Sequence, residues 1–361
     1  MVEVAVVGAG VFGLACAWAC LRRGLSVVVL EAEAPGTGAS GGVVGALSPF
    51  SPRGWSAGKA FQLAALRDAE AGWAEIAAAG GVDPGYARPG RIMPLSSREA
   101  RARAEVQAEA ARDAWGAAAA WRIEDEFPDW LDPAAAPCGV AVETLSARLD
   151  PRRAVAALAA AVAAQGGELR AGWRALAVGG GVVETDRGAV AAGAVILAGG
   201  AAGFALAPEL PGLAVKGQAA LLAADAPPRT PLVRHDEVYI VPQPGGRVAV
   251  GATSEAAWTD RRATDARLDD VISAARALCP ALRGAPVIER WAGLRPRGLR
   301  PEPMLGPVPG RPGVFLAGGG FRIGFGIALA VGQALAAMVA GGDPGLPPGW
   351  TVEAHLRRQM R

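Results

Sequence analysis

The chain opens with the stretch Val4-Ala-Val-Val7, Gly8-Ala-Gly10-Val-Phe-Gly13 and an alanine-rich run, after which Val27-Val-Val-Leu30 leads to Glu31. This order predicts a strand, a tight glycine turn, a helix to about Arg23 and a second strand, which is the βαβ unit that binds the ADP half of a dinucleotide. Gly8 permits the turn, Gly10 lets backbone N–H groups approach a pyrophosphate, and Gly13 lets the helix pack against the strand. The pyrophosphate is expected at the helix N-terminus, with Glu31 accepting hydrogen bonds from the ribose. The unit alone does not distinguish FAD from NAD.

Length and composition exclude several classes of protein. The 361 residues favour two domains, and a formal net charge of +2 argues against a nucleic-acid partner. The cysteines form no C-x-x-C pair and the chain has only two histidines, so we expect no metal site and a reducing, cytoplasmic location. Cys16 and Cys20, one helical turn apart, are expected to pack as small apolar side chains.

One segment is apolar enough to be considered as a membrane-spanning helix. Residues 323–340 form an apolar run that a hydropathy window could interpret as a membrane span. Arg322 and the glycines before it instead favour a buried helix whose N-terminus points at a ligand. The N-terminus lacks a basic region and its apolar run is broken by glycines, so a signal peptide is not expected.

Two further segments are rich in glycine, which is typical of a backbone segment that runs close to a cofactor. One covers residues 35–49, and the other covers residues 318–326 and precedes the last helix. The run from Ala194 to Gly200 predicts a buried strand that ends at a ligand, and Asp150-Pro151 predicts a helix start that leads to Gly166. The chain is therefore expected to return to its first sheet.

The remaining segments predict a second, antiparallel sheet. Strands are expected over residues 86–95 and 214–224, and the pair 238–242 and 247–251 flanks a turn that indicates a hairpin. Helices are expected over residues 56–79, 97–120 and 265–282. Because these strands do not alternate with helices, they favour an antiparallel arrangement outside the first sheet.

Taken together, seven motifs resemble the FAD-dependent D-amino-acid and amine oxidase family, and most closely its glycine oxidase branch. They are the N-terminal fingerprint with Glu31, Ala39-Ser40 leading to Gly45-Ala-Leu-Ser-Pro49, Val215-Lys-Gly-Gln218, Tyr239-Ile-Val-Pro242, Val250-Gly-Ala-Thr253, Trp291-Ala-Gly-Leu-Arg-Pro296, and Phe321-Arg322 before Gly324. They occur in the family order and span nearly the whole chain.

The resemblance implies an α/β fold in which a Rossmann-like FAD-binding domain is interleaved with an antiparallel-sheet α+β substrate domain. The FAD domain is expected to comprise residues 1–80, 145–212 and 288–361, and the substrate domain residues 81–144 and 213–287. It further implies oxidation of a small amino acid or N-alkyl amino acid to an imine, with the α-hydrogen transferred as hydride to flavin N5. The electron acceptor is then O2 or another, unknown acceptor.

The resemblance also assigns residues. Arg295 matches the arginine that pairs with the substrate carboxylate, Tyr239 the tyrosine that assists it, and Arg322 a second arginine beside flavin and substrate. The residues expected to bind FAD are Gly8, Gly10, Val11, Phe12, Gly13, Glu31, Ala32, Gly38, Ala39, Ser40, Val44, Gly45, Ala46, Ala175, Gly199, Gly320, Phe321, Arg322, Ile323, Gly324, Phe325 and Gly326.

The chain departs from the family pattern at several positions. Gly320 and Ile323 replace the histidine and asparagine usual in glycine oxidases, and Glu237 adds negative charge two residues before Tyr239, which puts glycine itself in doubt as the substrate. Sarcosine oxidases carry an oxygen-activating lysine at about the position of Ala249, and they attach FAD through a cysteine near the C-terminus. Because no cysteine follows Cys279, FAD is expected to bind noncovalently.

Alternatives to an oxidase remain open. A D-amino-acid or imino-acid dehydrogenase would pass electrons to a quinone or carrier, and a flavin-binding module of a larger complex would need neither Arg295 nor Tyr239. An NAD-dependent dehydrogenase would not need the glycine-rich segments 40–49 and 318–326. The oligomeric state is left undetermined.

Overall fold

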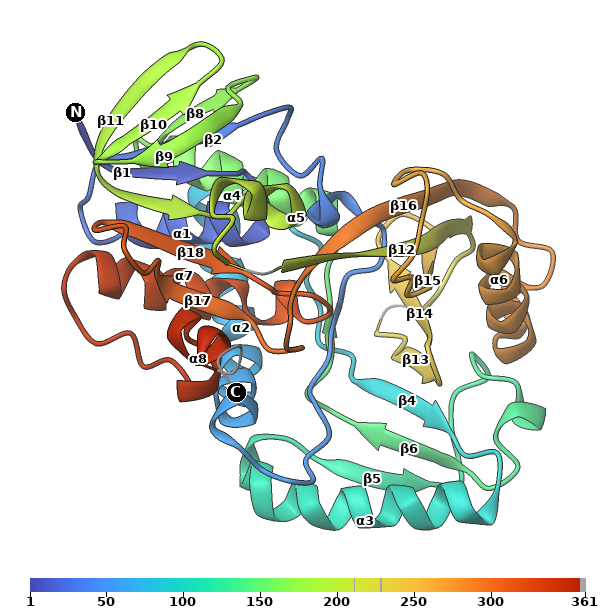
Figure 1. Cartoon of the computed structure of the whole chain (residues 1–361). Coiled ribbons are helices and arrows are strands. Elements are labelled where there is room, and N and C mark those ends of the chain that lie inside the picture. Colours follow the sequence, from blue (N-terminus) through green and yellow to red (C-terminus); the bar gives the residue numbers. More distant parts are fainter. Residues whose placement is uncertain (211, 228, 358–361) are drawn as a thin grey trace.

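The computed structural model describes residues 1–210, 212–227 and 229–357. Two large sheets dominate it, one with the N-terminal strand on the left of Figure 1 and one on the right. Strands β12 (Gly212–Ala223) and β16 (Val287–Gly298) form a long pair at one edge of the second sheet, which reaches toward the first sheet in Figure 1. The α/β class with an antiparallel second sheet is therefore confirmed.

The first sheet contains the predicted βαβ unit. Strands β1 (Val2–Val7) and β2 (Val27–Glu31) are parallel neighbours joined by α1 (Val11–Leu21). The predicted return strand is β11 (Gly188–Leu197), which pairs with β1 on its other side. The order is β17 (Met304–Pro307), β18 (Val314–Gly318), β11, β1, β2 and β8 (Glu168–Ala171), with β9 (Ala175–Gly179) and β10 (Val182–Thr185) forming a ribbon on β11.

Apolar helices cover one face of the first sheet. Helices α1, α2 (Ala57–Gly80), α4 (Pro151–Ala164) and α7 (Gly324–Val339) share a core around the fully buried Trp73. Asp150 begins α4 as predicted, because its carboxylate accepts from the backbone N–H groups of Arg152 and Arg153. The short helices α5 (Gly200–Gly203) and α8 (Val352–Leu356) complete the region.

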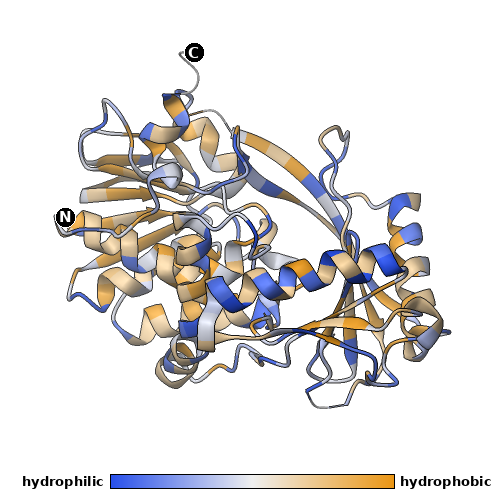
Figure 2. Ribbon diagram, turned by 90° about the horizontal axis from the view of Figure 1, so that it is seen from below, coloured by the Kyte–Doolittle hydropathy of each residue, from blue (hydrophilic) through white to orange (hydrophobic). Residues whose placement is uncertain are grey.

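The second sheet is almost wholly antiparallel. Its order is β16, β12, β15 (Arg247–Gly251), β14 (Val238–Gln243), β13 (Leu232–His235), β4 (Arg91–Pro94), β6 (Val140–Glu143) and β5 (Trp121–Glu124). The predicted hairpin is the β14–β15 pair, and α6 (Ala266–Leu278) packs on one face of the sheet. Helix α3 (Arg98–Trp115) lies nearest the viewer in Figure 2, where hydrophilic residues line its length. A two-stranded ribbon, β3 (Ala46–Leu47) with β7 (Ala147–Arg148), lies apart from both sheets.

Several predicted elements are shorter than expected, for local reasons. The strand expected over residues 86–95 is only Arg91–Pro94, because Gly90 has a positive φ of 77°. Helix α3 ends at Trp115 rather than near residue 120, because Gly116 also has a positive φ. Helix α6 ends at Leu278, shortly before Pro280.

Strand β16 begins at the predicted domain boundary near residue 288 and pairs with β12 along its length. This strand belongs to the second sheet, whereas the resemblance implied that residues 288–361 form part of the FAD domain. The division into domains stays a prediction.

The apolar run at residues 323–340 forms α7, a buried helix that packs against α1. Among the residues that the structure describes, no helix is both long and apolar enough to cross a bilayer. Cys16 and Cys20 are fully buried in the same core, as expected of small apolar side chains, and burial raises the pKa of the Cys20 thiol to about 12.

Candidate active site

Three glycine-rich segments that lie far apart in the sequence meet at the N-terminus of α1. The backbone N–H of Val11 donates to Ser40 Oγ at 3.0 Å. A Cβ added to Gly320 would lie only 2.7 Å from Phe12 Cζ, so the turn before α7 packs directly on the fingerprint. The tertiary fold thus brings together the segments that the sequence predicted to contact one cofactor.

The glycines of the fingerprint are required by close backbone approach. Gly8 has a φ of +106°, and a Cβ there would lie 2.6 Å from the carbonyl oxygen of Ala198, next to Gly199. A Cβ on Gly13 would lie 1.9 Å from the carbonyl oxygen of Gly8. The strand, turn and helix therefore close together as predicted.

The end of β2 and the start of α1 fit the ADP half of FAD. Glu31 Oε2 accepts from the backbone N–H of Ala9 at 2.8 Å and Oε1 from that of Glu33 at 3.0 Å, which fixes the carboxylate beside the glycine turn. Within α1 the first turn carries no acidic residue, and its N-cap is Gly10, which has no side chain. An anionic pyrophosphate is favoured at such a helix end.

The segment after Ser40 leads from this helix end to the second sheet. Val44 lies close to β15, because a Cβ on Gly251 would be 2.8 Å from Val44 Cγ2. Gly42 lies against the Trp291 ring, to which an added Cβ would be 3.2 Å, and Ala46 packs in the same apolar cluster. This segment therefore connects the predicted cofactor residues with the sheet face that carries Tyr239.

That sheet face is defined by the strand register. Tyr239 pairs with Gly251, Gly251 with Ala219, and Ala219 with Trp291. Because directly opposed residues share a face and side chains alternate along a strand, Arg295, four residues after Trp291, lies on this face as well. We call it the front face of the second sheet.

Arg295 is held in place by two backbone features. Its Nη1 donates to the carbonyl oxygen of Thr253 at 2.9 Å. Its guanidinium lies over Gly217, where an added Cβ would be 2.3 Å from Cζ. Burial and, secondarily, repulsion by Arg322 lower the pKa of Arg295 to about 10, so the guanidinium remains cationic at neutral pH. A fixed, partly buried cation of this kind suits a carboxylate ligand.

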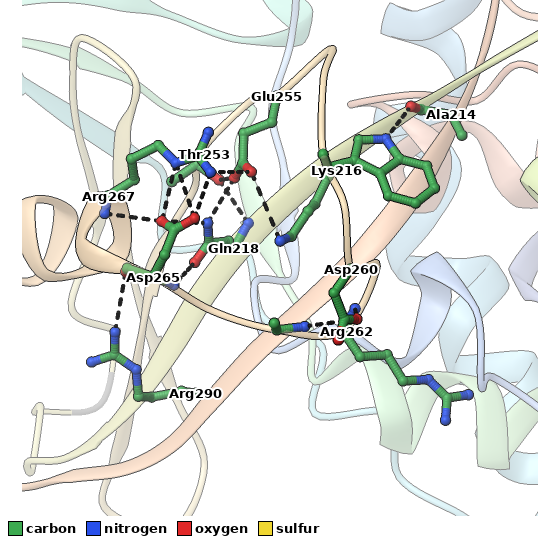
Figure 3. A network of polar contacts seen from close by, with 12 residues as sticks. Ala214, Lys216, Gln218, Thr253, Glu255, Asp260, Arg262, Asp265, Arg267 and Arg290 are labelled. Carbon is green, nitrogen blue, oxygen red and sulfur yellow. Dashed lines mark hydrogen bonds and ion pairs between the residues drawn. The ribbon is translucent and has the colours of Figure 1, made fainter.

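A polar network on the reverse face holds the Thr253 segment (Figure 3). Thr253 Oγ1 accepts from the backbone N–H of Gln218 at 2.9 Å and donates to Glu255 Oε1. Gln218 Nε2 donates to both Glu255 Oε1 and Asp265 Oδ1, each at 2.9 Å. Because side chains alternate along a strand, Gln218 faces the side of the sheet opposite to Gly217. Lys216 Nζ lies 3.9 Å from Glu255 Oε2, and the Arg267 guanidinium beside Asp265 holds the pKa of that carboxyl well below its usual range.

Arg322 and Glu237 form an ion pair, with Nη1 and Oε2 2.8 Å apart. The backbone N–H of the preceding Phe321 donates to the carbonyl oxygen of Pro296 at 3.0 Å, which ties this loop to β16 just after Arg295. Ile323 is the N-cap of α7, and Gly324, Phe325 and Gly326 form its first turn. The negative charge expected from Glu237 is therefore paired.

The remaining predicted residues fall into two groups. Ala32, Gly38, Ala39 and Gly45 lie on the connected segment from β2 to β3, where a Cβ on Gly45 would be 1.9 Å from the carbonyl oxygen of Leu149. Ala175 is the first residue of β9, in the β9–β10 ribbon that pairs with β11, and it packs against the apolar cluster that contains Val7 and Leu30, next to Gly8 and Glu31. Sequence reasoning missed Gly217, Thr253 and Arg91 as individual functional positions. Gly217 and Thr253 lie inside motifs that the sequence did single out, whereas Arg91 carries no such signal.

The chain has clear similarity to known flavoproteins. A family model described as FAD dependent oxidoreductase matches residues 3–338. The glycine oxidase of Geobacillus kaustophilus (strain HTA426) is 30% identical over 93% of this chain and 92% of its own length. The crystal structure of glycine oxidase from Geobacillus kaustophilus has a TM-score of 0.85 at 27% identity and covers 95% of both chains. That of iminodiacetate oxidase from Chelativorans sp. BNC1 has a TM-score of 0.83 at 24% identity and covers 96% of this chain and 97% of its own, a likeness of fold.

Within the described parts of the chain, no group of three or more histidine, cysteine, aspartate or glutamate side chains could hold a metal ion. The matching family and the convergence of three glycine-rich segments at the N-terminus of α1 agree on a nucleotide cofactor. The chain belongs to the FAD-dependent oxidoreductase family, and FAD is its cofactor.

Proposed function

We propose that the protein catalyses the FAD-dependent oxidative deamination of a small amino acid or N-alkyl amino acid. The observation that carries this proposal is the fixed guanidinium of Arg295 on the front face of the second sheet. The same face bears Tyr239 and is covered by residues 42–46, which we call the Val44 segment. A planar cation at such a position binds a carboxylate through paired hydrogen bonds. The names of the relatives, glycine oxidase among them, support the same substrate class.

In this proposal the side chains bind and orient the substrate. Arg295 pairs with the carboxylate, Tyr239 adds a hydrogen bond to it, and Arg322 lies beside flavin and substrate. FAD, when bound, accepts the hydride that leaves the substrate α-carbon. No side chain needs to act as a general base if the amine binds in its neutral form, so the rate depends chiefly on orientation.

The proposed cofactor contacts follow the predicted list, from Gly8 through Gly326. The N-terminus of α1 would hold the pyrophosphate and Glu31 the ribose, and the Val44 segment and the turn around Gly320 would contact the isoalloxazine. FAD binds noncovalently, since no cysteine follows Cys279. The replacement of polar residues by Gly320 and Ile323 favours a substrate other than glycine.

The test is anaerobic reduction of the flavin. Purified protein reconstituted with FAD is mixed with small D- and L-amino acids, glycine and N-methyl amino acids, and the loss of flavin absorbance is recorded. We expect at least one of them to bleach the flavin. Arg295→Met is expected to retain FAD and to lose this reduction. The proposal fails if no such substrate bleaches the flavin of the wild-type protein.

A second measurement identifies the electron acceptor. Oxygen consumption with peroxide release during turnover supports an oxidase. Turnover only with an added quinone or dye supports a dehydrogenase. If both the wild type and Arg295→Met retain FAD and no amino acid reduces the flavin of either protein, the protein is instead a flavin-binding module.

A further inference from the structure

A buried arginine forms a hydrogen bond with the hydroxyl group of Tyr239. Arg91 on β4 is 1% exposed, and its Nη1 donates to Tyr239 Oη at 3.2 Å. Arg91 pairs with Leu232, which lies two residues before Arg234, the partner of Tyr239 in the β13–β14 ladder. Arg91 therefore lies on the front face of the second sheet, with Tyr239 and Arg295.

Glu143 fixes the position of Arg91. The carboxylate is fully buried, and its Oε1 lies 3.1 Å from Arg91 Nε. Its other oxygen, Oε2, accepts from the backbone N–H groups of Leu145 and Ser146 at 2.8 Å and 3.0 Å. Because one carboxylate oxygen is bound by rigid backbone and the other pairs with Arg91, the guanidinium is held by the fold and not by solvent.

The direction of the Arg91–Tyr239 hydrogen bond has a chemical consequence. A guanidinium has five donors and no acceptor, whereas a phenol can donate one hydrogen bond and also accept. With Arg91 donating to Oη, the phenol cannot donate back to Arg91. The hydroxyl hydrogen must therefore point to another acceptor.

We propose that Arg91, held by Glu143, is a positioning residue that makes Tyr239 a hydrogen-bond donor to the substrate carboxylate. This inference rests on the proposed function, since it assigns the carboxylate to the site that contains Tyr239 and Arg295. Arg91 does not touch the substrate and acts only through the Tyr239 hydroxyl. The Arg91–Glu143 pair thus selects an acceptor, such as a carboxylate oxygen, at that point of the site.

The test uses acetate, an unreactive carboxylate, whose binding to the FAD-loaded protein is followed by the change in the flavin spectrum. We expect Arg91→Gln to weaken acetate binding about tenfold, the size of one lost hydrogen bond to a charged group. In a Tyr239→Phe background the same substitution is expected to have no further effect. With the amino acid that reduces the flavin, KM is expected to rise while kcat stays near the wild-type value.

Two further variants keep the test decisive. Arg91→Gln leaves Glu143 buried without its partner, so Arg91→Gln/Glu143→Gln, which removes both charges, is measured in parallel and is expected to show the same loss of affinity. The matched control is Arg88→Gln, because Arg88 Nη2 donates to the chain's other tyrosine, Tyr86, at 3.0 Å. It is expected to leave acetate binding unchanged.

The outcomes separate the two proposals. If the wild type binds acetate but both Arg91 variants bind it equally well, the role of Arg91 is refuted and the proposed function stands. An equal loss on substituting Arg91 in the Tyr239→Phe background also refutes it, since Arg91 would then not act through the hydroxyl. If the wild type neither responds to acetate nor is reduced by any amino acid, both proposals are overturned.

Discussion

Substituting Gly217 by alanine tests the proposed role of Arg295 without removing any functional group. A Cβ at Gly217 would lie 2.3 Å from both Cζ and Nη2 of Arg295 and 2.4 Å from Nη1. Ordinary contacts between such atoms are about 3.5 Å or more, so the guanidinium must move by roughly 1 Å. The end of a flexible side chain can make this movement, and Gly217 lies in a strand without positive φ, so the fold is expected to remain intact.

The loss in substrate binding can be estimated from the contacts at stake. The displacement breaks the hydrogen bond to the Thr253 carbonyl and misaligns the two that a carboxylate would receive. Hydrogen bonds to charged groups contribute about 1.5–3 kcal/mol each, so a net loss of about 3 kcal/mol is expected. This corresponds to a roughly hundredfold weaker affinity for a carboxylate.

The assay measures the Kd of acetate from the flavin spectrum and the KM of the amino acid that reduces the flavin. The FAD content and the melting temperature of the variant are expected to stay near those of the wild type. Gly179→Ala is the matched control, because at this strand glycine no described atom outside its own neighbours lies within 4 Å of an added Cβ. Acetate affinity within twofold of the wild type in Gly217→Ala would refute the proposed placement of the carboxylate at Arg295.

Three further predictions follow from the same contacts. Thr253→Val removes the hydroxyl group that links Gln218 to Glu255, and it is expected to raise the KM for the substrate about fivefold. Thr253→Ser keeps the hydroxyl group and is expected to have a KM close to that of the wild type in the same kinetic assay. Gly13→Ala places a Cβ 1.9 Å from the carbonyl oxygen of Gly8, so it is expected to lower the free energy of unfolding by more than about 3 kcal/mol and thus the melting temperature of the apoprotein. An unchanged melting temperature would contradict the packing of the βαβ unit. The three buried cysteines are expected to react with a thiol reagent only after denaturation, because burial raises the pKa of Cys20 and Cys279 to about 12. Fast reaction of any thiol other than the half-buried Cys138 in the folded protein would contradict this prediction.

The sequence by itself determined the elements whose signals are local. The glycine spacing from Gly8 to Gly13 predicts a turn that only glycine can make, and Asp150-Pro151 predicts a helix start through a cap and a fixed φ. Strand lengths were less well predicted, as for β4, because Gly90 with its positive φ delays the start of a strand that was predicted to begin at residue 86. The motifs that resemble the family predicted substrate-binding roles for Arg295 and Tyr239, but they did not indicate the residues that hold these two side chains.

Only the tertiary structure decided which residues meet across the second sheet. Nothing near Arg295 in the sequence indicates that Thr253 and Gly217 fix its guanidinium, since both contacts depend on the register of β12 with β16 and on the loop after β15. The same holds for Arg91, which lies 148 residues from Tyr239 and reaches it only because β4 and β13 pair side by side. Local patterns specify turns and helix ends through covalent geometry, whereas strand partners are chosen by packing of the whole chain, so the orientation of the site can be known only from the fold.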